Sequence, residues 1–193
     1  MAFTMIVSIH QPEHFPYLGY FQKMADTDVF VLLDNVNYRK NYFQNRNRFL
    51  NKNGVEEWFT IPVPKDSVKK HIKDVVPIEG DWRKKIVKQH KQHFGLDLSY
   101  VYDRETLAEI NIASIVYCMH RLGTMPHIVK ASTLSATGTK SELLANICKE
   151  LSATKYISGP SGKDYLETKY FEGIDIEFFK PKVPDIYTTL SHL

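Results

Sequence analysis

The sequence is poor in cysteine, with only Cys118 and Cys148 among 193 residues. Two cysteines are too few for a disulfide framework, and their separation fits no paired spacing of metal ligands. Each lies in an apolar helical pattern, which predicts a buried thiol. We therefore expect a protein of a reducing compartment, the cytoplasm.

Long apolar runs and a large net charge are also missing. The longest apolar runs, such as Asp28–Leu33, fall far short of the roughly 18 residues that span a bilayer, and Met1–Ile9 lacks the basic start of a signal peptide. The 25 basic and 22 acidic residues leave a net charge of +3, which excludes a polybasic tail and a disordered acidic chain. We expect a soluble protein with no membrane insertion and no nucleic-acid partner, although a local basic site is compatible with this charge.

The chain has enough apolar residues, 43%, to form one substantial core, and we predict a single domain over residues 1–193. Met5–Ile9 and Val29–Leu33 are continuous apolar runs, and Tyr17–Ala25 between them has the spacing of one helix face. Strand, helix and strand in this order predict a βαβ unit. Continuous rather than alternating apolar strands favour a parallel sheet that is covered on both faces.

The remaining chain continues this pattern after one interruption. Residues 40–65 contain two runs around Asn53-Gly54, which predicts an inserted antiparallel hairpin. Further helices are expected at 81–94, 109–122, 141–151 and 164–171, and further strands at 128–131, 156–158 and 174–179. His90 and His93 fall on a lysine-rich helix face, where we expect them to be solvated. The predicted fold is α/β, an open and mainly parallel sheet with helices on both faces, of Rossmann-like or nucleotidyltransferase-like topology, with a small antiparallel insertion.

Ligands of open α/β sheets bind beyond the carboxyl ends of the strands, and four polar segments have that placement. The first, His10–Gly19, begins with His10 and Gln11 at the end of the first strand. His10 resembles the phosphate-binding histidine of nucleotidyltransferase-type folds, or it forms only the hydrogen bonds of a turn. Glu13 and His14 suggest a metal pair with His10, but Pro12 and Pro16 prevent the helix that such a pair needs, so we expect no metal site.

The second segment, Asp34–Arg48, contains two arginines that alternate with two asparagines. On a strand, Arg46 and Arg48 would share one face, and Asn45 and Asn47 would share the other. Guanidinium and amide groups suit phosphate, carboxylate or sugar hydroxyls, although a solvated edge strand has a similar pattern. Asp34 ends a buried strand and is a candidate base or ribose acceptor, or simply part of a turn.

The third and fourth segments combine glycine, hydroxyl and lysine residues. Gly138–Ser141 lacks the spacing of a P-loop, but Thr139 and Lys140 precede a helix whose first N–H groups could hold an anion or could simply be capped. Ser158–Tyr165 has two glycines, which allow a ligand to approach the backbone, and Lys163, which complements negative charge. No Gly-x-Ser-x-Gly motif is present, so no serine hydrolase arrangement is indicated.

These blocks, in this order, resemble a known family. The blocks are His10-Gln11-Pro12, Phe15–Phe21, Asp28–Val31, Asn45–Arg48, Asp81–Arg83, Asn111-Ile112, Gly138–Lys140 and Ser158–Leu166. They are similar to the WbqC-like family of bacterial proteins, which occurs in gene clusters for O-antigen and other surface polysaccharides. His14 departs from the aromatic residue expected in relatives, and relatives are expected to continue beyond Leu193 into another apolar helix.

The resemblance implies a transferase that attaches an acyl or aminoacyl group to the amine of a nucleotide-linked amino sugar. The expected partners would then be an acyl or aminoacyl donor, either free or on a carrier. The expected catalytic residues are His10, Gln11 and Asp34. The expected substrate-binding residues are Tyr17, Asn45, Arg46, Asn47, Arg48, Thr139, Lys140, Ser158, Gly159, Ser161, Gly162, Lys163 and Tyr165. Two alternatives are an ATP-using, adenylate-forming or nucleotidyltransferase-type enzyme, and a non-catalytic protein that binds nucleotide sugars for another enzyme.

Overall fold

The computed structural model describes residues 4–182 and 186–193. The chain divides into two compact units. The sheet unit comprises Met1–Gln11, Gly19–Leu33 and Thr124–Pro184, and the hairpin unit comprises Pro12–Leu18, Asp34–Gly123 and Asp185–Leu193. The single domain expected from the sequence stays a prediction.

The sheet unit contains five parallel strands, in the spatial order β5-β2-β1-β6-β7. The strands are β1 (Ile6–His10), β2 (Val29–Leu32), β5 (His127–Lys130), β6 (Lys155–Ser158) and β7 (Asp175–Phe178). From β1 the chain adds β2 and β5 on one side and then β6 and β7 on the other, so the strand order reverses between β1 and β6. This is the order of a Rossmann-like sheet, and it confirms the predicted α/β class.

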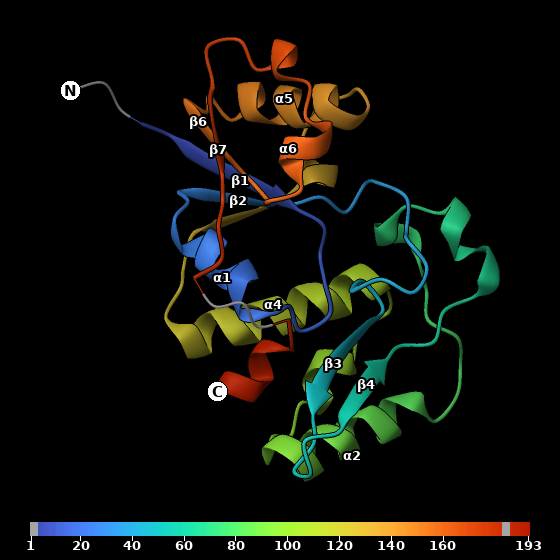
Figure 1. Cartoon of the computed structure of the whole chain (residues 1–193). Helices are drawn as coiled ribbons and strands as arrows, with labels where there is room; N and C mark the ends of the chain where they lie inside the picture. The colour runs from blue at the N-terminus through green and yellow to red at the C-terminus, as the bar shows by residue number, and fades with distance from the viewer. Residues whose placement is uncertain (1–3, 183–185) are drawn as a thin grey trace. The chain divides into compact units, whose positions relative to one another are not determined.

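Helices cover both faces of this sheet (Figure 1). The helix α1 (Leu18–Ala25) lies on one face, and α5 (Lys140–Glu150) and α6 (Gly162–Tyr165) lie on the other. Right-handed crossovers require this arrangement, because the β1–β2 and β5–β6 connections run in opposite directions across the sheet. All four residues of β2 are buried, as continuous apolar composition predicts for a central parallel strand.

The helix predicted over residues 164–171 is wrong in extent. The structure has the short helix α6 and then a separate 3₁₀ turn at Thr168–Tyr170. Leu166 between them is extended, and the Glu167 N–H donates to Ser141 Oγ at 3.1 Å. This hydrogen bond to a side chain of α5 replaces the one that would have continued the helix.

The hairpin unit contains the predicted antiparallel pair and three helices. Its elements are β3 (Arg46–Leu50), β4 (Glu56–Thr60), α2 (Trp82–Phe94), α3 (Ser99–Tyr102) and α4 (Leu107–Leu122). Gly54 has a φ of +74° in the turn between β3 and β4, a conformation that glycine adopts readily. The helix α4 starts earlier than predicted, because Thr106 and Glu109 form a reciprocal capping box.

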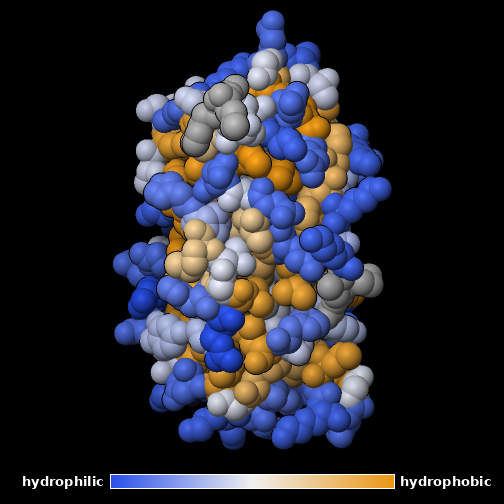
Figure 2. Space-filling model, turned by 90° about the vertical axis from the view of Figure 1, so that its left-hand side faces the viewer, coloured by the Kyte–Doolittle hydropathy of each residue, from blue (hydrophilic) through white to orange (hydrophobic). Residues whose placement is uncertain are grey.

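Aromatic rings and histidines form the core of the hairpin unit. Phe49 and Phe59 stack with 4.4 Å between ring centres, and the His90 ring lies 4.3 Å from Phe59. The prediction of a solvated His90 is wrong, because Trp82, Ile86 and His90 form one buried stripe of α2. No helix in the described ranges is long and apolar enough to cross a membrane, and hydrophilic side chains interrupt the apolar ones on the face shown in Figure 2.

Candidate functional site at the strand ends and in the hairpin

At the carboxyl end of β1, a tyrosine of α1 holds the first polar segment. The His10 and Tyr20 rings lie 4.7 Å apart at an angle of 31°, and the Tyr20 hydroxyl donates to the Gln11 carbonyl at 3.3 Å. Tyr20 is fully buried. It therefore fixes both the ring of His10 and the start of the following loop. Tyr20 was not predicted as a site residue, because an aromatic residue on a helix face normally indicates packing.

At the carboxyl end of β6, Ser158 is fully buried against α6. Over residues 4–182 and 186–193 its Oγ forms no well-formed hydrogen bond, although the Tyr156 hydroxyl is near enough to interact weakly. A Cβ added to Gly162 would lie 2.1 Å from this Oγ. The close packing of Gly162 on Ser158 thus explains why this position of the Ser158–Tyr165 segment is a glycine.

The ends of β1 and β6 are neighbours in the sheet. Ser8 pairs with Ile157, so the two strands end side by side at His10 and at Ser158-Gly159. The His10 ring contacts α1, whereas Ser158 lies against α6 on the opposite face. The edge where the strand order reverses is therefore lined by polar residues that come from both faces.

The third and fourth segments meet through Ser141. Its Oγ donates to the Tyr165 carbonyl at 3.5 Å and accepts from the Glu167 N–H at 3.1 Å. This places Thr139 and Lys140 beside the end of α6. Both side chains are exposed, as is that of Ser161. Lys163 is also exposed, and its ammonium lies 5.6 Å from the centre of the Phe178 ring.

In the hairpin unit, Arg46 and Arg48 share one face of β3, as alternation predicts. Their guanidinium groups lie 4.4 and 5.6 Å from the centre of the Trp58 ring, which is directly opposite Arg48 on β4. Arg48 also pairs with Glu56 at 3.2 Å. Arg46 has no ion pair with a described residue, and its Nη2 donates to the Asn41 carbonyl at 3.0 Å. Arg46 is thus the more available of the two cations.

The two asparagines of this segment differ in what they bind. The Asn47 amide donates to the carbonyls of His14 and Phe15 at 3.2 and 2.6 Å, and its oxygen accepts from the Arg48 N–H. Asn47 thereby anchors the His14-Phe15 turn. The Asn45 amide donates to the Ile61 carbonyl at 3.0 Å, and its buried Oδ1 accepts from no described residue.

Tyr17 and Asp34, the other predicted residues of this unit, are held by the surrounding backbone. Tyr17 forms an antiparallel bridge with Thr188, and the Asp34 carbonyl accepts from the Lys73 N–H at 3.0 Å.

Burial and the nearby Glu13 raise the pKa of Tyr17 to about 12. Glu13 itself is only 3% exposed, and burial together with Glu13 raises the pKa of Tyr42. This buried carboxylate among phenols was not predicted, since Pro12 and Pro16 obscure any regular spacing around it.

A hydrogen-bonded group of two histidines and a tyrosine lies inside the hairpin unit. The Tyr102 hydroxyl is 2.9 Å from His14 Nε2 and 2.5 Å from His90 Nε2. Burial lowers the pKa of His90 to about 3 and that of His14 well below its usual value. Neither histidine is thus prepared to act on a ligand as a charged group. Over residues 4–182 and 186–193, no three His, Cys, Asp or Glu side chains are grouped to hold a metal ion.

The parallel sheet, whose strand order reverses between β1 and β6, defines a Rossmann-like α/β protein. In such folds ligands bind at the edge where the order reverses, and polar residues line that edge here. The chain belongs to the WbqC-like protein family, whose model matches residues 11–192. This confirms the resemblance seen in the sequence. The chain is also similar to the uncharacterized protein Rv1507c of Mycobacterium tuberculosis, with 28% identity over 88% of this chain and 79% of that protein. No solved structure matches the chain significantly.

Proposed function

We propose that this protein is a transferase that attaches an acyl or aminoacyl group to the amine of a nucleotide-linked amino sugar in bacterial surface-polysaccharide biosynthesis, such as that of O-antigen. The observation that carries the proposal is the adjacency of His10 and Ser158-Gly159 at the ends of β1 and β6, where the strand order reverses. Nucleotide-containing ligands bind at this position in Rossmann-like sheets. The buried free thiols support a reducing compartment, the cytoplasm.

His10 is the proposed general base. Its imidazole would take a proton from the sugar amine as the nitrogen attacks the donor's carbonyl carbon. The new C–N bond forms, the bond between the carbonyl carbon and the donor's leaving group breaks, and His10 returns the proton to that leaving group. The Gln11 amide would stabilise the oxyanion of the intermediate, and Asp34 would orient a ribose or sugar hydroxyl. The Tyr20 ring, whose centre lies 4.7 Å from that of the His10 ring, limits the orientations open to His10.

The remaining polar residues are proposed to bind the substrates. In the sheet unit, cations, hydroxyls and flexible backbone suit the diphosphate of a nucleotide sugar; these residues are Thr139, Lys140, Ser158, Gly159, Ser161, Gly162, Lys163 and Tyr165. In the hairpin unit, Tyr17, Asn45, Arg46, Asn47 and Arg48 would contact sugar or donor groups. Arg46 is the first choice among them, because Arg48 is already paired with Glu56.

The test is to incubate the purified protein with nucleotide-linked amino sugars and a series of acyl and aminoacyl donors, and to detect N-acylated product by mass spectrometry. His10→Ala should lower kcat by about 10²–10⁴-fold, the usual contribution of a general base, while nucleotide-sugar binding is kept. His71→Gln changes an exposed histidine and is the matched control. Absence of product with every donor, together with absence of nucleotide-sugar binding, would refute the proposal.

Two other outcomes would assign a different function. Exchange of pyrophosphate into ATP that depends on a carboxylic acid would indicate an adenylate-forming enzyme. Nucleotide-sugar binding without turnover, unchanged in His10→Ala and Arg46→Ala, would indicate a binding partner for another enzyme.

A further inference from the structure

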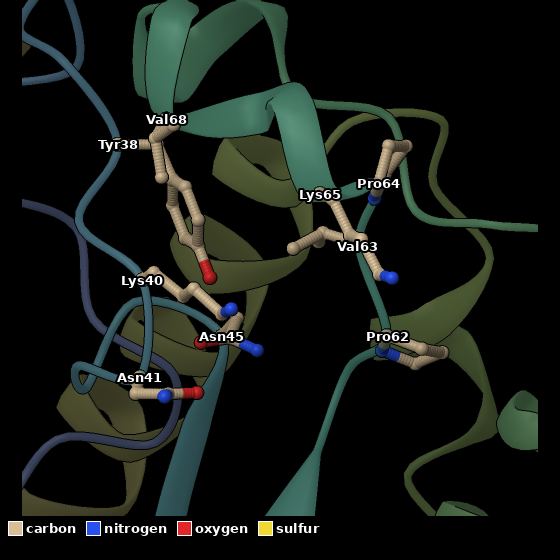
Figure 3. A pocket seen from close by; sticks show the side chains of 9 residues that line it. All are labelled: Tyr38, Lys40, Asn41, Asn45, Pro62, Val63, Pro64, Lys65 and Val68. Atoms are coloured by element: carbon tan, nitrogen blue, oxygen red, sulfur yellow. The ribbon is translucent and has the colours of Figure 1, made fainter.

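The hairpin unit contains a pocket of about 180 Å³ that lies beyond the last paired residues of β3 and β4. Tyr38, Lys40 and Asn41 line one side and residues 62–65 the other, with Asn45 between them (Figure 3). The walls are fixed by backbone hydrogen bonds, from Ile61 N–H to the Asn45 carbonyl at 2.7 Å and from Tyr38 N–H to the Lys70 carbonyl at 2.9 Å.

Asn45 presents an unused acceptor to this pocket. Asn45 is 6% exposed, and its Nδ2 donates a hydrogen bond to the Ile61 carbonyl. That bond fixes which end of the amide is the oxygen, and Oδ1 is left buried with no hydrogen-bond partner among the residues that the structure describes. A buried acceptor without a partner is unfavourable unless a ligand or water donates to it. The group that fits here is therefore a hydroxyl or an amine.

Tyr38 adds a second polar atom in the same pocket. Tyr38 is 4% exposed, and its hydroxyl forms no well-formed hydrogen bond with any described residue. Burial raises the pKa of Tyr38, and the nearby Arg46 and the Asn41 backbone N–H lower it in part. The phenol therefore stays protonated, and it can donate a hydrogen bond to a ligand oxygen.

The pocket also has a positive rim. Lys40 and Lys65 are both exposed lining residues. Within the described part of the chain, neither ammonium forms an ion pair with a carboxylate. Two uncompensated cations beside buried hydrogen-bonding atoms favour a ligand with a phosphate or a carboxylate.

We propose that this pocket binds a small hydroxylated anion of the sugar phosphate or sugar acid type. Ligand hydroxyls donate to Asn45 Oδ1 and accept from Tyr38, and the anionic group lies near Lys40 and Lys65. The C–H groups of the ring contact the prolines and valines of residues 62–68. The volume is below the roughly 300–1,000 Å³ of pockets for drug-sized ligands, so the pocket suits one ring and its anionic group. The pocket shares Asn45 with the substrate contacts proposed above, but it contains none of the proposed catalytic residues, so its binding can be measured without acyl transfer.

The test is calorimetric and NMR titration of the full chain with glucose 6-phosphate and glucuronate, and with glucose and inorganic phosphate as partial ligands. Tyr38→Phe removes only the hydroxyl, and it should leave the melting temperature unchanged because that hydroxyl has no well-formed bond to lose. It should raise the Kd of the bound anion about 5- to 10-fold, the usual effect of one hydrogen bond. The double variant Lys40→Gln/Lys65→Gln should raise the Kd at least as much, whereas Lys88→Gln, the same change on the exposed surface of α2, should not.

Several results would overturn the proposal. One is absence of binding of either sugar anion at millimolar concentration, and another is a Kd unchanged in both pocket variants. Glucose that binds as tightly as its phosphate would contradict the role of the lysines. Inorganic phosphate that binds as tightly as glucose 6-phosphate would contradict the role of Asn45 and Tyr38. Because His10→Ala should retain this binding, a failed transferase assay and a failed pocket assay can be told apart.

Discussion

His90 and His14 are the residues whose environment differs most from their sequence context. His90 follows lysines along α2, yet it is fully buried and hydrogen-bonded to Tyr102. The Nδ1 atoms of both histidines are buried, and in the described part of the chain no group accepts a hydrogen bond from either, so protonation would add an N–H without an acceptor there. Burial therefore keeps both rings neutral, so that their protonation at low pH should destabilise the folded protein.

The free energy of unfolding should fall as the pH is lowered from about 6.5 towards 3. The pKa of His90 is about 3 in the folded protein and near 6.5 in the unfolded chain, so the unfolded state binds more protons in this window. The stabilisation is complete above the unfolded pKa, and each buried histidine should remove about 1.4 kcal/mol per pH unit below it. Urea unfolding at pH 7, 6, 5 and 4 measures this slope.

The control for this experiment is a pair of variants. His90→Phe should reduce the slope, and His71→Gln, at an exposed histidine, should leave it unchanged. A His90→Phe slope equal to that of the native protein would mean that other groups cause the acid sensitivity.

Asn47 should be needed for stability whatever its part in binding. Asn47→Ala removes amide donors from the carbonyls of His14 and Phe15 and an acceptor from the Arg48 N–H. Loss of buried hydrogen bonds of this kind costs about 1–3 kcal/mol, and thermal unfolding would show it as a lower melting temperature. Asn53→Ala in the exposed hairpin turn is the matched control, and equal melting temperatures of the two variants would disprove the anchoring role.

At the scale of elements, α6 packs so closely on β6 at Gly162 that a hydrogen atom fits there but a Cβ does not. Gly162→Ala would place a Cβ 2.1 Å from Ser158 Oγ and 2.9 Å from Leu166 Cδ1, so the side chains of Ser158 and Leu166 must shift. Overpacking of this kind costs about 1–3 kcal/mol, which is several degrees in melting temperature for a chain of this size. Gly159→Ala has open space around its Cβ and should be tolerated. A melting temperature for Gly162→Ala equal to that of Gly159→Ala would contradict this packing.

Most elements were predictable because their signals are local. The runs that form β1 and β2 are apolar throughout, and Gly95 and Gly123 end α2 and α4 in the left-handed conformation. The failures involve partners distant in sequence. Residues 164–171 do not form one helix because Ser141 takes the Glu167 N–H, and no local pattern contains that hydrogen bond.

At the scale of the whole molecule, each unit contains one buried thiol. Cys148 lies in the sheet unit and Cys118 in the hairpin unit. Burial raises the pKa of Cys148 to about 12 and also raises that of Cys118, so neither thiol should react in the native protein at neutral pH. Each thiol thus reports the unfolding of its own unit.

A single domain predicts that both thiols become reactive at the same urea concentration. Alkylation at increasing urea, followed by peptide mass spectrometry, gives a separate unfolding curve for Cys118 and Cys148. Coincident midpoints would support one cooperative domain. Clearly separated midpoints would contradict the single-domain prediction and show that the two units unfold independently.

The sequence predicted which residues belong to the candidate site, but not which of them are neighbours in space. The residue types at the ends of strands identify His10, Ser158 and Lys163 as candidates without any structure. Their neighbours depend on the strand order, which brings the end of β6 beside that of β1 although about 150 residues separate them. The contact of Tyr20 with His10, the phenols near Glu13 and the pocket around Tyr38 were not predicted, because they depend on how distant segments are buried against one another.

The sequence by itself determined that this protein is an α/β protein of the WbqC-like family, with a parallel sheet, an inserted hairpin and reduced thiols, because periodicity, turn residues and motif order are properties of adjacent residues. Only the tertiary structure decided that His90 is buried, that Asn47 supports a turn and that Asn45 and Tyr38 share a pocket. Those outcomes depend on desolvation and hydrogen bonding between segments far apart in the chain. In the same way, only the tertiary structure places one of the two cysteines in each unit, where each thiol can report unfolding.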